Sequence, residues 1–123
     1  MVSRVLIVDD EQDTAYIIAA LVSTFDCQVR VAANGPDAIV AAREFQPDLV
    51  LLDIAMPGMD GYEVAARLRV DAGLTEAKFV ALTALRRDDG QLRQAGFSDY
   101  LLKPVLRQSL QRILGKSDEG AAR

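Results

Sequence analysis

Short apolar runs alternate with helix-like patterns along the whole chain, and this alternation constrains the fold more than any other feature of the sequence. Most of the runs are continuously apolar, which is typical of strands that are buried on both faces. They lie at Arg4–Val8, Gln28–Ala32, Leu49–Leu52, Phe79–Leu82 and Ser98–Leu102. Such strands separated by helices favour a doubly wound α/β domain, in which helices cover both faces of a parallel sheet.

The segments between these runs carry apolar residues at the spacing of amphipathic helices. The first stripe runs from Ala15 to Phe25, and the second begins after Pro36, which suits a first helical turn, and stops before Pro47. Further helices are expected at Tyr62–Val70, at about Asp88–Ala95, and around Leu106, Leu110, Ile113 and Leu114. The pattern of Asp88–Ala95 is mostly polar, so we expect that helix to be weakly packed.

The composition narrows the kinds of site that the chain can hold. Its 123 residues contain no histidine and one cysteine, Cys27, so histidine chemistry is excluded, a zinc site is not expected and no intrachain disulfide can form. A net charge of −4 argues against direct nucleic-acid binding. No apolar run approaches the ~20 residues of a membrane span, and no secretory signal precedes the first strand, so we expect a cytoplasmic protein without membrane contact.

Polar side chains stand at the carboxyl ends of four of the five expected strands. Asp9 and Asp10 follow the first strand, Asp53 ends the third, Thr83 ends the fourth and Lys103 follows the fifth. The carboxyl ends of parallel strands meet at one edge of the sheet, and ligands bind in the crevice above that edge. These residues are therefore expected to converge.

Three carboxylates in one crevice repel one another, and each raises the pKa of its neighbours. Protonation, a lysine or a divalent cation would relieve the repulsion. Lys103 supplies one positive charge, which is not enough for Asp9, Asp10 and Asp53 together. We therefore expect a Mg²⁺ site, which Mn²⁺ could also fill, because hard cations bind carboxylate oxygens.

The expected cluster fits phosphoryl transfer better than nucleotide binding. The chain has no GxGxxG and no GxxxxGK[ST] motif that would cradle a nucleotide phosphate. A carboxylate can attack phosphorus to give an acyl phosphate. Mg²⁺ and Lys103 would neutralise the transferring oxygens, and Thr83 could donate a hydrogen bond to one of them.

Four motifs in this order resemble the receiver domain of two-component response regulators. They are VDD at 8–10, LLDIAMPGMDG at 51–61, ALTA at 81–84 and DYLLKPV at 99–105. The resemblance covers the chain from about Arg4 to Leu114. It implies a flavodoxin-like sheet of five strands in the order 2-1-3-4-5 with five helices. We expect a receiver domain at residues 1–116 and a short polar tail at 117–123.

The resemblance also implies roles for the residues around the acids. It makes Asp53 the phosphoacceptor and, with Asp9 and Asp10, part of the metal site. Asp10 would be a direct metal ligand, Asp9 a ligand through water, and the backbone carbonyl of Ala55 a further ligand.

Three more roles follow from the same resemblance. Thr83 and Lys103 correspond to the pair that binds the phosphoryl group. Tyr100 corresponds to an aromatic switch residue that packs inward when Thr83 is drawn to that group. The bond between Lys103 and Pro104 is expected to be cis.

Such a domain is a signalling switch and not an enzyme, since it catalyses only its own phosphorylation and dephosphorylation. The implied phosphodonor is a histidine kinase or a histidine phosphotransfer protein, and the phosphorylated form would control a protein partner through its fourth helix, fifth strand and fifth helix. Arg86, Arg87 and Arg93 could belong to that surface or be ordinary solvated residues, and dimerisation there is possible. Ala55 and Leu85 offer no polar group to an attacking water, so we expect slow loss of the phosphoryl group.

Two other functions compete with this interpretation. A phosphorylation-independent scaffold would share the fold, but every expected site residue is present. A phosphatase of the haloacid dehalogenase type would need a second acid two residues after its nucleophile, where this chain has Ala55. The chain itself could be a single-domain regulator or the receiver of a longer regulator or hybrid kinase.

Overall fold

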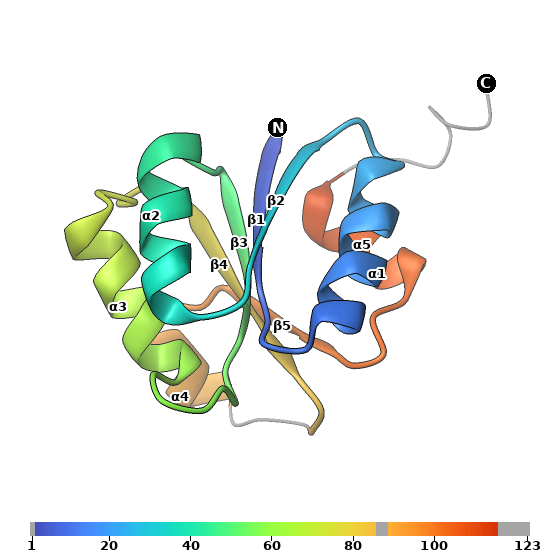
Figure 1. Cartoon of the computed structure of the whole chain (residues 1–123). Coiled ribbons are helices and arrows are strands. Elements are labelled where there is room, and N and C mark those ends of the chain that lie inside the picture. Colours follow the sequence, from blue (N-terminus) through green and yellow to red (C-terminus); the bar gives the residue numbers. More distant parts are fainter. Residues whose placement is uncertain (1, 86–88, 116–123) are drawn as a thin grey trace.

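One five-stranded parallel sheet forms the centre of the protein (Figure 1). The computed structural model describes residues 2–85 and 89–115. The strands are β1 (Arg4–Val8), β2 (Gln28–Ala32), β3 (Leu49–Asp53), β4 (Lys78–Thr83) and β5 (Asp99–Leu102). Their order in the sheet is β2-β1-β3-β4-β5, and every neighbouring pair is parallel. The expected fold class and strand order are confirmed.

The helices cover both faces of this sheet. They are α1 (Gln12–Ser23), α2 (Gly35–Phe45), α3 (Gly61–Asp71), α4 (Asp89–Gln94) and α5 (Arg107–Leu114). Figure 1 shows α1 and α5 on one face and α2, α3 and α4 on the other. Neighbouring side chains of β1 point to opposite faces, so Leu6 and Val8 pack in one core layer while Val5 and Ile7 pack in the other. Both layers are fully buried at β1, which explains its unbroken apolar run.

Side-chain caps define the starts of two helices. The Asn34 side chain accepts a hydrogen bond from the N–H of Asp37 at 2.8 Å, and Pro36 occupies the first turn of α2. The Asp60 side chain accepts one from the N–H of Glu63 at 2.9 Å, which places α3 directly after the loop that follows β3. These caps fix where α2 and α3 begin at the carboxyl edge of the sheet.

The structure differs from the expected elements at a few ends. Phe25 lies beyond the end of α1, although it is still buried. Leu106, which the pattern groups with the buried face of the last helix, is the N-cap residue of α5 and is 61% exposed. Its position just after the loop turns it away from the core that Leu110 and Leu114 reach. Arg86 and Arg87 of the expected basic patch, and the expected tail at 117–123, lie outside the described residues.

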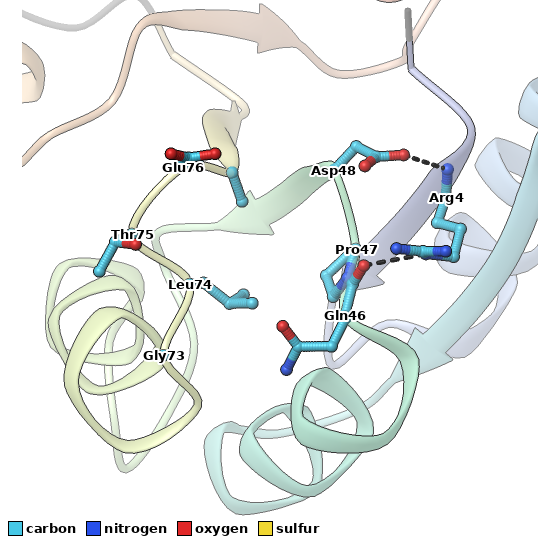
Figure 2. Close-up of a pocket in the computed structure, with 9 residues that line it drawn as sticks. Arg4, Gln46, Pro47, Asp48, Gly73, Leu74, Thr75 and Glu76 are labelled. Atoms are coloured by element: carbon cyan, nitrogen blue, oxygen red, sulfur yellow. Dashed lines mark hydrogen bonds between the residues drawn. The ribbon is translucent and has the colours of Figure 1, made fainter.

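The amino edge of the sheet is held by Asp48 (Figure 2). Its Oδ2 accepts hydrogen bonds from the N–H groups of Ser3 and Arg4, both at 2.9 Å. The Arg4 side chain donates in turn to the carbonyl of Gln46 at 2.9 Å. A cavity of about 370 Å³ lies beside these residues and extends to the loop between α3 and β4. Asp48 therefore ties the start of β1 to the start of β3 at the edge opposite the expected site.

Two further observations bear on the expectations. The peptide bond between Lys103 and Pro104 is cis, as the resemblance implies. In the part of the chain that the structure describes, every helix is too short or too polar to cross a bilayer.

Candidate functional site

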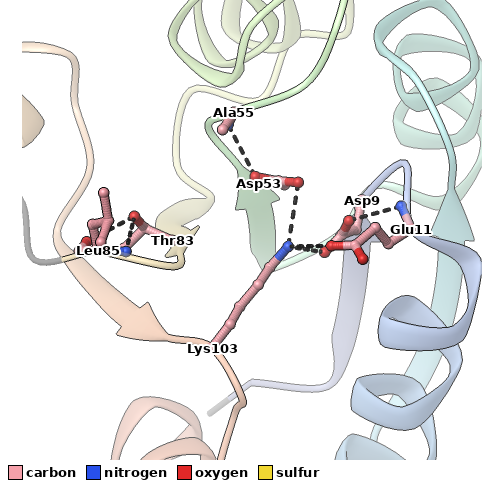
Figure 3. Close-up of polar contacts among 7 residues, drawn as sticks. All are labelled: Asp9, Glu11, Asp53, Ala55, Thr83, Leu85 and Lys103. Carbon is pink, nitrogen blue, oxygen red and sulfur yellow. Dashed lines mark hydrogen bonds and ion pairs between the residues drawn. The ribbon is translucent and has the colours of Figure 1, made fainter.

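The polar residues expected at the strand ends converge at the carboxyl edge of the sheet (Figure 3). The register explains this convergence, because Val8 pairs with Leu52, and Thr83 at the end of β4 pairs with Leu102. The residues that follow these pairs are therefore level with one another. Asp53 is the last residue of β3, and Asp9 and Lys103 directly follow β1 and β5. Their side chains point toward one another.

The three acids lie close together but differ in exposure. Asp9, Asp10 and Asp53 each offer a carboxylate oxygen within 4.8 Å of the other two. Asp9 is fully buried, Asp53 is 4% exposed and Asp10 is exposed. One oxygen of each buried acid accepts a hydrogen bond from a backbone N–H two residues further on: Glu11 donates to Asp9 at 3.0 Å, and Ala55 donates to Asp53 at 2.9 Å.

The second oxygen of each buried acid faces the ammonium of Lys103. Nζ of Lys103 lies 2.7 Å from Oδ2 of Asp9 and 3.3 Å from Oδ2 of Asp53. The exposed Glu11 carboxylate is 3.7 Å away and, in solvent, adds little. One lysine thus serves as counter-ion to two buried acids, which leaves the site with excess negative charge.

Burial and pairing shift the pKa values of these groups. Burial raises the pKa of Asp9 above its ordinary value, and the contacts with Lys103 and with the N–H of Glu11 offset this only in part. Burial alone would lower the pKa of Lys103, but its contacts with Asp9 and Asp53 more than compensate, so the pKa is raised. Lys103 is therefore held in its charged form, while Asp9 lacks some of the stabilisation that an ionised carboxylate needs.

These residues fit a hard divalent cation. Oδ2 of Asp9 lies 2.7 Å from the Lys103 ammonium and has no other hydrogen-bond partner among the residues that the structure describes. It therefore retains the capacity to approach a cation or a water bound to one. The donor set is entirely carboxylate oxygen, which is what Mg²⁺ prefers. Ala55 lies at the same edge, with its N–H bound to Asp53, and the role of its carbonyl as a ligand stays a prediction.

Thr83 and Tyr100 lie near the carboxyl edge of the sheet, but the contacts described for them are not with the acids or Lys103. The hydroxyl of Thr83 donates to the carbonyl of Leu85 at 2.8 Å and accepts from the N–H of Leu85 at 3.2 Å. Figure 3 shows this pair set apart from the Lys103 ion pairs. Tyr100 is half-buried against the core layer of α2, α3 and α4. Their roles in phosphoryl binding and switching stay predictions.

Sequence reasoning did not anticipate two partners at this site. The contact of Glu11 with Lys103 could have been predicted from the sequence, because Glu11 continues the acidic run after β1. No feature of the sequence predicts that the Thr83 hydroxyl bonds to the backbone of Leu85, because any residue type offers the same N–H and carbonyl.

Comparison with known proteins identifies the family. Residues 5–115 match the response regulator receiver domain. The chain is 33% identical over 114 residues to Protein PilH of Pseudomonas aeruginosa, and the match covers 91% of this chain and 94% of PilH. It is 37% identical over 107 residues to Response regulator PleD of Caulobacter vibrioides, where the match covers 85% of this chain and 24% of PleD.

A solved structure with a similar sequence identity to this chain has the same fold. The receiver domain of sensor histidine kinase PA1611 from Pseudomonas aeruginosa was solved with a magnesium ion coordinated in its active-site cleft. It matches this chain with a TM-score of 0.79 and 33% identity, covering 91% of this chain and 93% of that domain. Fold, motifs and matches agree, and the chain belongs to the response regulator receiver domain family of two-component signalling.

Proposed function

We propose that the chain is a phosphoacceptor switch that takes a phosphoryl group from a phosphohistidine donor onto Asp53 in the presence of Mg²⁺. The observation that carries the proposal is the position of the Asp53 carboxylate. It is nearly buried at the carboxyl edge of the sheet, 3.3 Å from the Lys103 ammonium and within reach of Asp9 and Asp10. A carboxylate so placed is a nucleophile with positive charge beside it, which acyl phosphate formation needs.

Each residue of the site has a separate role in the proposed phosphoryl transfer. A carboxylate oxygen of Asp53 attacks phosphorus, the bond from phosphorus to the donor nitrogen breaks, and its electron pair leaves with the donor imidazole. The Lys103 ammonium, already within 3.3 Å of Asp53, neutralises one oxygen of the transferred group. Asp9, Asp10 and Asp53, with the Ala55 carbonyl, would hold Mg²⁺, which supplies neutralising charge to the phosphoryl oxygens.

Thr83 connects the site to the rest of the domain in this proposal. Its hydroxyl is occupied by the backbone of Leu85 and has to leave the Leu85 carbonyl to donate to a phosphoryl oxygen. The space that Thr83 vacates is where Tyr100 would pack, which would change the α4-β5-α5 surface for a downstream protein or a second receiver. Ala55 and Leu85 are both exposed and apolar, which favours a long-lived phosphoryl group.

The proposed donors are a histidine kinase or a histidine phosphotransfer protein, with the chain acting in the cytoplasm. We do not propose that it turns over a separate substrate, because the nucleophile itself keeps the phosphoryl group until water removes it.

Intact mass after incubation with acetyl phosphate and Mg²⁺ tests the proposal. We expect one added phosphoryl group in the natural chain, none without a divalent cation and none in Asp53→Asn. Asp26→Asn, a change at an exposed acid after α1, is the matched control and should still be phosphorylated. A chain that gains no phosphoryl group, and whose amide spectrum does not respond to beryllofluoride with Mg²⁺, would contradict the proposal and leave a scaffold.

A further inference from the structure

Helix α3 places two buried polar atoms without partners under a short segment that follows β4. Tyr62 and Arg69 lie two turns apart on α3, which puts them on one face of the helix. Neither the hydroxyl of Tyr62 nor Nη2 of Arg69 has a hydrogen-bond partner among residues 2–85 and 89–115, and both atoms are inaccessible to solvent. Buried polar atoms without partners destabilise the conformation that buries them.

Both side chains contact the segment of residues 89–98, which comprises α4 and the turn into β5 and is called the α4 segment below. The rings of Tyr62 and Phe97 meet edge to face, with centroids 5.9 Å apart. Gly96, at φ +90°, closes directly over Arg69, because a Cβ built on Gly96 would clash with Nη2 of Arg69. The turn after α4 therefore contacts both side chains of α3, and Figure 1 shows α4 on the same face of the sheet as α3.

Few apolar side chains attach the α4 segment to the core. Leu92 and Phe97 are buried, whereas the side chains of Gln91, Arg93 and Gln94 are exposed. A cavity of about 120 Å³ lies along the segment and is lined by Leu92, Phe97 and Tyr100, among others. A short helix held by few apolar side chains separates from its neighbours more readily than the rest of a domain.

The stacking of Arg69 on Phe79 belongs to a different contact. The guanidinium carbon lies 4.4 Å from the centroid of the Phe79 ring, and Phe79 is in β4. This cation–π contact joins α3 to the sheet and involves no residue of the α4 segment. Burial also lowers the pKa of Arg69, and no acidic partner among the described residues offsets this. Separation of the segment would return water to this group without loss of its ring contact.

We propose that Tyr62 and Arg69 are positioning residues that keep the resting contact between α3 and the α4 segment weak, so that the segment separates from α3 when Asp53 is phosphorylated. The link to phosphorylation rests on the proposed function. Water reaches the Tyr62 hydroxyl and the Arg69 guanidinium in the separated state, which lowers the free energy of that state relative to the resting one. The predicted switch residue Tyr100 lines the cavity beside the same segment, so inward packing of its ring would act on this contact.

Native-state amide hydrogen exchange of the metal-free chain tests the weak contact. The amides of Ala95, Gly96 and Phe97 donate to carbonyls within the segment and report its local unfolding. The amide of Ser98 donates to the carbonyl of Phe79 in β4 at 2.9 Å and reports separation of the segment from the sheet. Tyr62→Phe keeps the ring and removes only the unpartnered hydroxyl, so we expect these amides to exchange about tenfold more slowly. Arg69→Met keeps an unbranched side chain over Phe79 and should slow the same amides.

The matched control is Tyr16→Phe, which removes a hydroxyl from a tyrosine that is 57% exposed on α1 and should leave exchange unchanged. Wild-type exchange rates in both Tyr62→Phe and Arg69→Met would overturn the proposal, because the buried atoms would then have no effect on opening.

Beryllofluoride affinity in the presence of Mg²⁺ tests the link to activation. If the phosphorylated state has the segment separated, Tyr62→Phe lowers the affinity by the same factor by which it slows exchange, because both measure one equilibrium. Slower exchange with unchanged affinity would overturn the link to phosphorylation. A natural chain that binds no beryllofluoride would overturn the proposed function and this link with it, while the exchange rates still decide whether the buried atoms weaken the contact.

Discussion

Asp9 and Asp48 are carboxylates at opposite edges of one sheet, and their surroundings shift their pKa values in opposite directions. Burial raises the pKa of Asp9 at the carboxyl edge. Burial would also raise the pKa of Asp48, but the N–H groups of Arg4 and Ser3 more than offset it, so the pKa of Asp48 is lowered. Ionised Asp48 therefore stabilises the fold, whereas burial disfavours the ionised form of Asp9 and the contact with Lys103 offsets this only in part.

The first prediction concerns Asp48 and pH. A lowered pKa in the folded state means that the ionised group stabilises the fold above its unfolded pKa of 3.8, and that this stability is lost as pH falls through the lower, folded value. We expect Asp48→Asn to lower the free energy of unfolding by about 1–2 kcal/mol at pH 7, because a neutral acceptor binds the two N–H groups less strongly.

Denaturant unfolding of both chains between pH 7 and pH 2 checks this prediction, and the difference between them should shrink below pH 3.8. Glu76→Gln changes an exposed acid beside the same cavity and should have no comparable effect. A difference between Asp48→Asn and the natural chain that stays constant down to pH 2 would show that ionisation of Asp48 is not the cause.

At the scale of the elements, the strands and helices could be predicted from the spacing of apolar residues, whereas details set by loops and by backbone groups could not. The apolar run of β1 and the stripe of α1 determine strand and helix because burial requires those spacings. The convergence of Asp9, Asp53 and Lys103 was predictable as well, since parallel strands end at one edge. The exposure of Leu106 depends on where the loop after β5 turns, and the hydroxyl direction of Thr83 depends on backbone groups that carry no sequence signal.

The junction of β3 and α3 supports a second prediction. A Cβ at Gly61 would clash with Cα of Ile54 and stand 2.7 Å from the carbonyl oxygen of Asp53, and backbone atoms cannot move aside cheaply. We expect Gly61→Ala to lower the free energy of unfolding by about 3 kcal/mol and to slow the proposed phosphorylation, because α3 has to shift beside Asp53, the proposed phosphoacceptor.

Gly73→Ala is the matched control for this change. Gly73 has φ +69°, and a Cβ added there would meet no atom within 4 Å, so alanine should cost about 1–2 kcal/mol from backbone strain alone and leave phosphorylation unchanged. Equal losses of unfolding free energy in the two variants would mean that the close packing at Gly61 is not what holds α3 in place.

At the scale of the whole molecule, the excess negative charge at the site predicts that Mg²⁺ stabilises the fold. A cation that binds only the native state raises the free energy of unfolding by about 2.7 kcal/mol when its concentration is one hundred times its dissociation constant. We therefore expect the thermal midpoint to rise with Mg²⁺ concentration. Asp10→Ala should abolish most of the rise, because Asp10 belongs to the three-acid cluster.

Asp13→Ala, which removes an exposed acid from the first turn of α1, provides the comparison and should keep the Mg²⁺ response. A full response in Asp10→Ala would place the cation somewhere other than among these acids. Differential scanning calorimetry at several Mg²⁺ concentrations is sufficient to separate the two results.

The all-parallel sheet also has a consequence for how the chain reaches its native state. Two strands joined by a tight turn can pair only antiparallel, and no neighbouring pair among the described strands is antiparallel. Even β4 and β5 pair across an intervening helix, and β1 needs β3, with all of β2 and α2 between them. No local hairpin can therefore start the sheet, so refolding should be slower than in a helical bundle of this size, with helix formation preceding strand pairing.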